Sequence, residues 1–331
     1  THSAFNGRTE KYTSLIPTQP QWSDPIGHGT HVAGIVLGDG SYRSNEDDYY
    51  HDNLDGTFAG MAPGAYMVAQ SLYGPNETFT YRNLTKWSVN NGAQISQNSW
   101  GTWTSSLWGN YTIVSRDYDN STRDADWTSP GNQSILVVFA AGNAGINGNN
   151  TLSTTAVAKN VIAVGATGNG KNVTGEGEVW LHSSRGWTDD GRIKPDLVAP
   201  GDDVTSTWAI DDNGASGNLP AEAGAHSYIT YGGTSMAAPV VSGSAALVMD
   251  HLISVEGLDE PSPAVVKSIL VASADHLSSS QWPSREQGWG RVNASRAIVE
   301  TRDSNMEIKY QTTKFHSVGA SHSYRYDVQA G

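Results

Sequence analysis

The sequence predicts an α/β fold, with a doubly wound, mostly parallel sheet and helices on both faces. Short, nearly continuous apolar runs bounded by Gly, Asn or Pro are typical of strands buried in a parallel sheet. Helical patterns lie between or after these runs, and such alternation indicates this fold class. The expected strands are 65–72, 93–101, 134–143, 160–167 and 195–201, and the expected helices are 28–37, 80–91, 110–120, 235–252, 262–273 and 293–301.

The chain divides into one large domain and the beginning of another. Residues 1–301 carry the α/β pattern, whereas residues 302–331 alternate with the period of two that is typical of strands. We therefore expect a C-terminal β-sandwich-like domain to begin at 302. The first residues contain no Met and the last residues stop in strand-like sequence. We expect the chain to be truncated at both ends.

Composition excludes several classes of function. The net charge of −13, from 33 acidic and 20 basic residues, argues against binding to nucleic acid or to an anionic membrane surface. The absence of cysteine excludes disulfides, thiolate nucleophiles and sulfur-ligated metals. No window approaches 18 apolar residues, and the sequence contains no signal-peptide pattern. We therefore expect no membrane span.

Ser235 is a candidate nucleophile. In "YGGTSMAAPVVSG", Thr234 is expected to cap a helix beginning at Ser235, where free backbone N–H groups favour a developing negative charge. The preceding Gly232 and Gly233 permit close approach of a substrate backbone. An ordinary capped helix rich in small residues explains these features equally well. The stretch does not match the G-x-S-x-G elbow of α/β-hydrolases.

Two histidines and one asparagine supply the remaining candidate chemistry. In "DPIGHGTHVAG", His28 is expected at the exposed start of a helix, and His31 is expected to be packed. Their spacing of three, without an intervening glutamate, does not fit the H-E-x-x-H zinc motif. Asn143 follows a buried strand between glycines, where its amide could donate to an oxyanion, an effect worth about 3–4 kcal/mol. Gly-Asn after a strand is more commonly a simple turn.

These stretches together, in this order, resemble the subtilisin-like serine peptidases. "GHGTHVAG" matches the histidine motif of that family, "FAAGNAG" its oxyanion-asparagine motif and "GTSMAAPVVSG" its serine motif. The resemblance extends from about residue 2 to about residue 300 and implies a serine endopeptidase. It makes Ser235 the nucleophile, His28 the general base and Asn143 an oxyanion donor. It also implies that an extended polypeptide substrate binds along Ser99, Trp100, Gly101 and Gly142.

The catalytic aspartate of the family is missing from this chain. The family carries it in a D-[ST]-G motif at the end of the first buried strand, and this chain begins with the stretch that follows that motif. We therefore expect the aspartate to lie upstream of Thr1, which would impair the activity of this chain. Asp24 stands in "SDPIG", does not match the motif, and is expected to shape the loop beside His28.

The sequence leaves one alternative function open. A catalytically silent subtilisin-like fold that acts as a binding module is the alternative function, and the presence of all three motif residues argues against it.

The chemistry requires no cofactor and we assign no metal ligands, although the acidic loop with Asn45, Glu46, Asp47, Asp48, Asp52 and Asp55 could hold a structural calcium ion. Secretion or a cell-surface location follows from the family resemblance alone.

Overall fold

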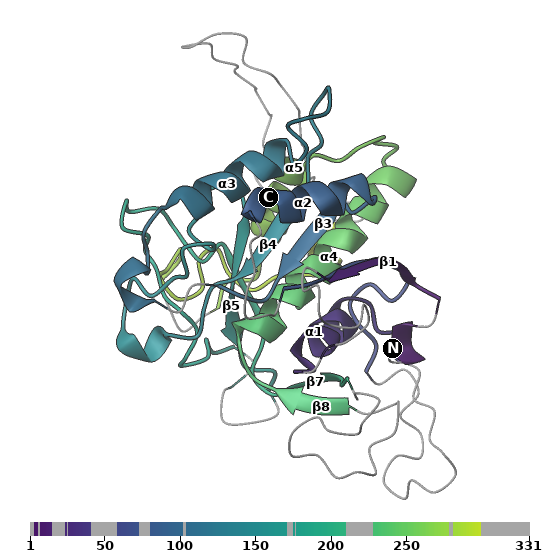
Figure 1. Ribbon diagram of the computed structural model, residues 1–331. Helices are drawn as coiled ribbons and strands as arrows, with labels where there is room; N and C mark the ends of the chain where they lie inside the picture. Colours follow the sequence, from purple (N-terminus) through teal and green to yellow (C-terminus); the bar gives the residue numbers. More distant parts are fainter. Residues whose placement is uncertain are drawn as a thin grey trace, which may run out of the picture.

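Several parallel strands and the helices packed against them form the centre of the molecule in the computed structural model (Figure 1). The structure describes the residues 3–5, 7–14, 24, 26–40, 58–72, 80–101, 104–170, 175, 177–209, 228–277 and 281–298. The predicted domain 302–331 and the acidic loop around 45–55 lie outside these residues.

The central sheet contains four parallel strands in the order in which they occur along the chain. All five predicted strands are present. Four of them form this sheet, and the fifth, β2 (Met67–Ser71), pairs in parallel with β1 (Thr9–Ser14). The strands of the central sheet are β3 (Ile95–Asn98), β4 (Leu136–Ala140), β5 (Ile162–Thr167) and β6 (Leu197–Pro200).

Strand β4 shows why the sheet must be covered on both faces. All five of its residues are buried, because alternate side chains enter two separate apolar clusters. Leu136, Val138 and Ala140 pack with α4 (Thr234–Ser254) and α5 (Pro263–Ala272). Val137 and Phe139 pack on the opposite face. This two-sided burial confirms the doubly wound α/β fold.

The helices begin and end close to the predicted positions. The opposite face carries α2 (Tyr81–Asn90) and α3 (Ile113–Arg123), which pack against each other. The first helix is α1 (His28–Leu37), and the last described one is α6 (Ala294–Ile298). Side-chain caps explain two of the starts: the Oγ1 of Thr80 accepts from Asn83 N at 3.3 Å, and the Oγ of Ser262 accepts from Val265 N at 3.4 Å.

A two-stranded antiparallel ribbon, which the sequence analysis did not predict, supports α1. It consists of β7 (Val204–Thr207) and β8 (Tyr228–Tyr231). The hydroxyls of Thr207 and Ser206 donate to the backbone oxygens of Thr30 and His31, each at 2.8 Å. These bonds attach the first turn of α1 to the ribbon, which lies beside α1 in Figure 1.

Helix α4 is the longest described helix and crosses the molecular core. By length and composition alone it could span a membrane, but most of it is buried inside the protein. It contacts β3, β4, β5 and β6 along one side, and its small residues permit this close packing. On the side of α1 a glycine permits a similarly close approach: a Cβ at Gly243 would lie 2.5 Å from the Cβ of Met61 and 3.3 Å from Val36 O. Its apolar character is therefore explained by burial against the sheet.

A buried charge cluster joins the beginning of β6 to α5. Asp196 lies 2.6 Å from Lys194 Nζ and 2.9 Å from Lys267 Nζ, and Ala163 N donates to it at 2.7 Å. Both lysines also donate to Val161 O. Burial lowers the pKa of Lys194 to about 7, an effect that Asp196 opposes. Burial alone would raise the pKa of Asp196, but the two lysines lower it overall.

Removing the negative charge of this cluster should destabilise the fold. Asp196→Asn leaves the buried Lys194 and the partly buried Lys267 without their counter-charge, and we expect the free energy of unfolding to fall by about 3–5 kcal/mol. Urea denaturation measures the change. Asp190→Asn is the control, because Asp190 pairs with Arg192 at 2.9 Å near the surface and such pairs contribute about 0–1 kcal/mol. Equal losses in the two variants would contradict the prediction.

Candidate active site

Ser235 lies in the first turn of α4, as the second residue of that helix. The helix begins at Thr234, one residue earlier than predicted, because Gly233 takes the N-cap position with a φ of 157°. Thr234 is therefore not the cap: its hydroxyl binds Asn143 instead. Ser235 is half-buried, and its hydroxyl donates to Ser99 O at 3.3 Å.

A proline inside α4 leaves the backbone carbonyl of Ser235 without its helical partner, and Ser99, the residue after β3, binds this carbonyl instead. In a regular helix, the N–H of residue 239 would donate to the carbonyl of Ser235, but Pro239 has no N–H. The hydroxyl of Ser99 takes this place and donates to Ser235 O at 2.6 Å. Ser99 therefore contacts Ser235 at two atoms, and the side-chain hydroxyl and the carbonyl of Ser235 are both held by one residue.

Asn143 is oriented by the residue that precedes Ser235. Its Oδ1 accepts from the backbone N of Thr234 at 2.9 Å and from the Thr234 hydroxyl at 2.8 Å. The carbonyl end of the amide is thus occupied, which leaves the Nδ2 end to donate. A Cβ built at Gly233 would lie 3.3 Å from Asn143 Nδ2 and 3.6 Å from Ser235 N. The Nδ2 of Asn143 and the backbone N of Ser235 therefore both lie close to Gly233.

His28 begins α1 and is half-buried. Its position depends on Gly27, which has a φ of 76° and a Cβ position only 2.6 Å from the ring of Trp208. Asp24 accepts hydrogen bonds from Gly27 N and Thr30 N at 3.1 and 2.7 Å. It therefore shapes the loop beside His28, as predicted, and also binds an N–H in the first turn of α1. Burial lowers the pKa of His28 below 6.5, and the charge of Asp24 partly opposes this shift.

Packing between α1 and α4 brings the beginnings of the two helices to the same region. Met236, next to Ser235, packs against Val32 and Ile35, which lie one to two turns beyond His28. Among the described residues, however, no hydrogen bond joins the imidazole of His28 to the hydroxyl of Ser235. The structure therefore brings Ser99 into direct contact with Ser235, places Asn143 beside the same pocket through its bonds to Thr234, and places His28 on the neighbouring helix.

His31 is packed inside the protein, as predicted. Its side chain is fully buried, and its Nε2 lies 3.1 Å from Val204 O and 3.0 Å from Ile229 O. One N–H can thus bridge strands β7 and β8. Burial lowers the pKa of His31 to about 4, so the ring is neutral at physiological pH.

The predicted substrate-binding residues line one pocket beside Ser235. Ser99, Trp100, Gly101 and Gly142 all border this pocket of about 250 Å³, together with Asn143 and Thr234. Sequence reasoning missed further lining residues, which come from segments without a recognisable motif: Trp108, Asn147, Thr151, Ser153 and Ser184. Only the fold brings these segments together.

Metal-binding chemistry has no support within the described part of the chain. There, no group of three or more His, Asp or Glu side chains is arranged to hold an ion. The proposed calcium ligands between Asn45 and Asp55 lie outside the described residues, so that site stays a prediction.

Comparison with known proteins adds family and fold information. Residues 6–290 match the model of the subtilase family. The chain is 26% identical over 311 residues to the serine protease AprX of Bacillus subtilis, covering 90% of this chain and 63% of AprX. It is 29% identical to pyrolysin of Pyrococcus furiosus, covering 83% of this chain and 21% of pyrolysin. The chain thus spans less than two thirds of either relative.

The fold also resembles solved protease structures. A mutant of the protease domain of PatA matches with a TM-score of 0.61 at 24% identity, over 90% of this chain and 89% of that domain. At this identity the comparison supports the fold alone.

The hydroxyl of Thr234 should contribute measurably to the stability of this junction. Thr234→Val keeps the shape but removes the donor to Asn143 and the acceptor for Gly142 N, which lies 3.2 Å away. We expect the free energy of unfolding to fall by about 1–3 kcal/mol in urea denaturation, because buried polar partners lose their bonds. Thr205→Val, in the exposed Thr205–Thr230 pair, is the control and should change it far less.

Proposed function

Because the chain belongs to the subtilase family, we propose that it is a serine endopeptidase with Ser235 as its nucleophile. The observation that carries this proposal is the junction at the beginning of α4, where Ser235 and the Asn143 amide are held beside one pocket. A nucleophile next to two N–H donors is the arrangement that acyl transfer uses.

The proposed reaction has two halves. The Ser235 oxygen attacks the carbonyl carbon of a peptide bond while His28 accepts its proton. The resulting oxyanion receives hydrogen bonds from Asn143 Nδ2 and Ser235 N. His28 then protonates the leaving amine as the C–N bond breaks, and an acyl-enzyme forms. Water, deprotonated by His28, attacks the acyl carbon. The ester C–O bond then breaks, the Ser235 oxygen takes the proton back from His28, and the carboxylic acid is released.

The substrate is proposed to be an extended polypeptide. Ser99, Trp100 and Gly101 follow β3 directly, so a peptide laid along them could pair with their backbone as an added strand. The chemistry uses protein groups alone and requires no cofactor. Secretion or a cell-surface location stays a prediction from the family.

Covalent labelling tests the nucleophile. The full-length natural protein, treated with a fluorophosphonate probe, should gain one label on Ser235, identified by mass spectrometry of the peptides. Ser235→Ala should lose both the label and peptide hydrolysis. Ser254→Ala is the matched control, because Ser254 is exposed at the other end of the same helix and should leave both unchanged. A folded natural protein without a label on Ser235 would overturn the proposal and favour a binding module.

The pH dependence tests the role of His28. A general base must be neutral, and the pKa of His28 is lowered by burial. We therefore expect kcat/KM to rise with pH through a midpoint below 6.5 and to be lost below that midpoint. Asp24→Asn removes the charge that raises this pKa, so the midpoint should move to still lower pH.

The matched control for this pH profile is Asp250→Asn, which removes an exposed carboxylate near the far end of α4. This control should leave the midpoint unchanged. A midpoint that stays in place or moves upward in Asp24→Asn would show that His28 is not the group that titrates.

A further inference from the structure

The sequence contains eight Asn-x-Ser/Thr motifs, none of them with proline in the middle, and the proposed function uses none of them. This tripeptide is the acceptor sequence for N-linked glycans in exported proteins. Chance produces many copies in a chain rich in Asn and Thr, so the motif alone identifies no site. The structure describes six of the eight asparagines, and their surroundings differ: Asn83, Asn110, Asn120, Asn132, Asn149 and Asn293.

Two of these asparagines are half-buried and use the atom to which a glycan would be attached. The sugar is bonded to the amide nitrogen, so Nδ2 must be free and open to solvent. The Nδ2 of Asn110 donates to Trp108 O at 3.3 Å, and the Nδ2 of Asn293 donates to Asp275 Oδ2 at 3.0 Å. A glycan on either residue would break this bond and displace the neighbouring chain.

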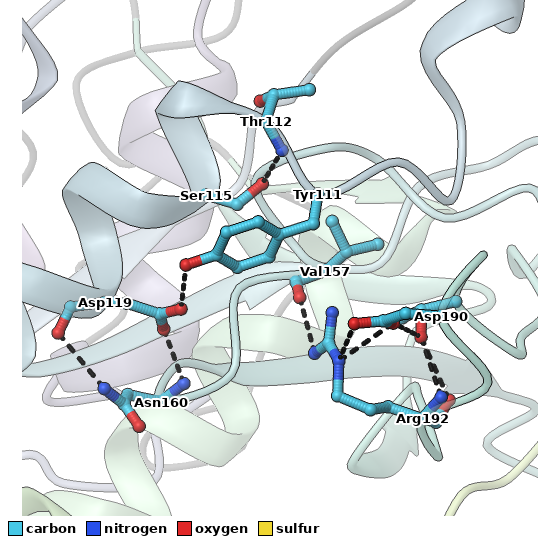
Figure 2. Close-up of polar contacts among 9 residues, drawn as sticks. Tyr111, Thr112, Ser115, Asp119, Val157, Asn160, Asp190 and Arg192 are labelled. Atoms are coloured by element: carbon cyan, nitrogen blue, oxygen red, sulfur yellow. Dashed lines mark hydrogen bonds and ion pairs between the residues drawn. The ribbon is translucent and has the colours of Figure 1, made fainter.

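The motif at Asn110 is also held at its second and third residues (Figure 2). The phenol of Tyr111 donates to Asp119 Oδ2 at 2.8 Å. Thr112 is the N-cap of α3, and its backbone N donates to Ser115 Oγ at 3.0 Å. Since all three residues of the motif are engaged in contacts of the folded protein, we expect Asn110 to be unmodified.

Three motifs combine an exposed asparagine with a buried threonine: Asn83–Thr85, Asn120–Thr122 and Asn149–Thr151. The three threonines are 1%, 5% and 3% exposed, respectively. The hydroxyl of Thr85, for example, donates to Ser121 Oγ at 2.8 Å, where α2 and α3 pack against each other. The folded protein therefore hides the hydroxyl that is part of the acceptor sequence.

The motif at Asn132 is open at both of its functional residues. Asn132 is exposed and Ser134 is half-buried, and neither side chain makes a hydrogen bond within the described part of the chain. Both lie between α3 and β4, outside any helix or strand. The contacts of this motif belong to its middle residue: Gln133 O accepts from Ala125 N at 2.8 Å, and Gln133 Nε2 donates to Pro130 O at 2.9 Å.

The loop that carries Asn132 lies away from the candidate active site. Asn132 precedes β4, whereas Asn143 follows that strand. Five residues of extended strand separate the two ends by about 16 Å. A large group on Asn132 would therefore point into solvent at the opposite edge of the sheet and leave the pocket beside Ser235 open.

We propose that Asn132 is the acceptor of an N-linked glycan. This inference goes beyond the peptidase function and rests on the predicted export of the protein. A membrane-bound transferase would supply an oligosaccharide carried on a lipid phosphate. The Nδ2 of Asn132 forms a bond to the anomeric carbon of the first sugar, and the bond from that carbon to the phosphate oxygen breaks. The lipid phosphate leaves with the bonding electrons, and Nδ2 gives one of its two protons to a base of the transferase.

Mass spectrometry of the protein isolated from its source organism tests this site. The peptide that contains Asn132 should carry a sugar chain on that residue in most copies, and the peptides with Asn110 and Asn293 should be unmodified. Fragmentation of the intact glycopeptide identifies the modified residue whatever the sugars are. Finding Asn132 unmodified, or finding Asn110 modified to the same extent, would overturn the proposal.

Variants produced in the same organism separate this modification from any other on the loop. Asn132→Gln should lower the mass of the intact protein by one glycan. Ser134→Ala keeps Asn132 but destroys the acceptor sequence, so it should lose the same mass. Ser134→Thr is the matched control, because it keeps a hydroxyl at this position and should keep the glycan. A sugar chain that persists in Ser134→Ala would contradict an N-linked glycan at Asn132.

The outcomes for this site are independent of those for the peptidase. Asn132→Gln should leave labelling of Ser235 and kcat/KM unchanged, because the loop lies at the other edge of the sheet. A protein that is labelled at Ser235 but carries no sugar on Asn132 overturns the glycan site and leaves the function standing. A folded protein with the sugar but without the label overturns the function and supports the glycan site.

Discussion

The candidate site depends on how the first turn of α4 is attached to the ends of β3 and β4. Ser99, after β3, holds the carbonyl of Ser235, which Pro239 leaves without its helical partner. Asn143, after β4, holds both the backbone and the hydroxyl of Thr234. Since α4 is buried along the sheet, its first turn has little freedom to shift independently. The proposed nucleophile, Ser235, is therefore in position before a substrate binds.

His28 is positioned by a different set of contacts. Helix α1 rests on the β7–β8 ribbon through the backbone oxygens of Thr30 and His31 and through the buried ring of His31. His28 and Ser235, the proposed base and nucleophile, thus stand on separate helices, and the packing of Met236 against α1 sets the relation of the two helices. Burial keeps His28 neutral near pH 7, the protonation state that a general base needs.

The parallel sheet explains why the candidate functional residues Ser99 and Asn143 lie at the same edge. Ser99 and Asn143 both follow carboxyl ends of neighbouring parallel strands, the edge at which sites form in α/β sheets. The strands can be this regular because β4 is apolar on both faces and because the charges of Asp196, Lys194 and Lys267 are paired beneath them. The sheet that these residues stabilise therefore also positions Ser99 and Asn143.

The sequence by itself determined the fold class, the five expected strands and the residues Ser235, Asn143 and Ser99 that meet in one site. The fold class and the strands were predicted correctly because buried strands need continuous apolar runs. The motifs are local, with their glycines beside the candidate residues, so the sequence also indicated which residues to expect in the site, and their roles stay predictions. Only the tertiary structure decided that the helix begins at Thr234, that β7 and β8 support α1, and that Trp108 lines the pocket. Such features depend on contacts between residues far apart in the chain, as between Gly109 and Leu152, and no local pattern records them.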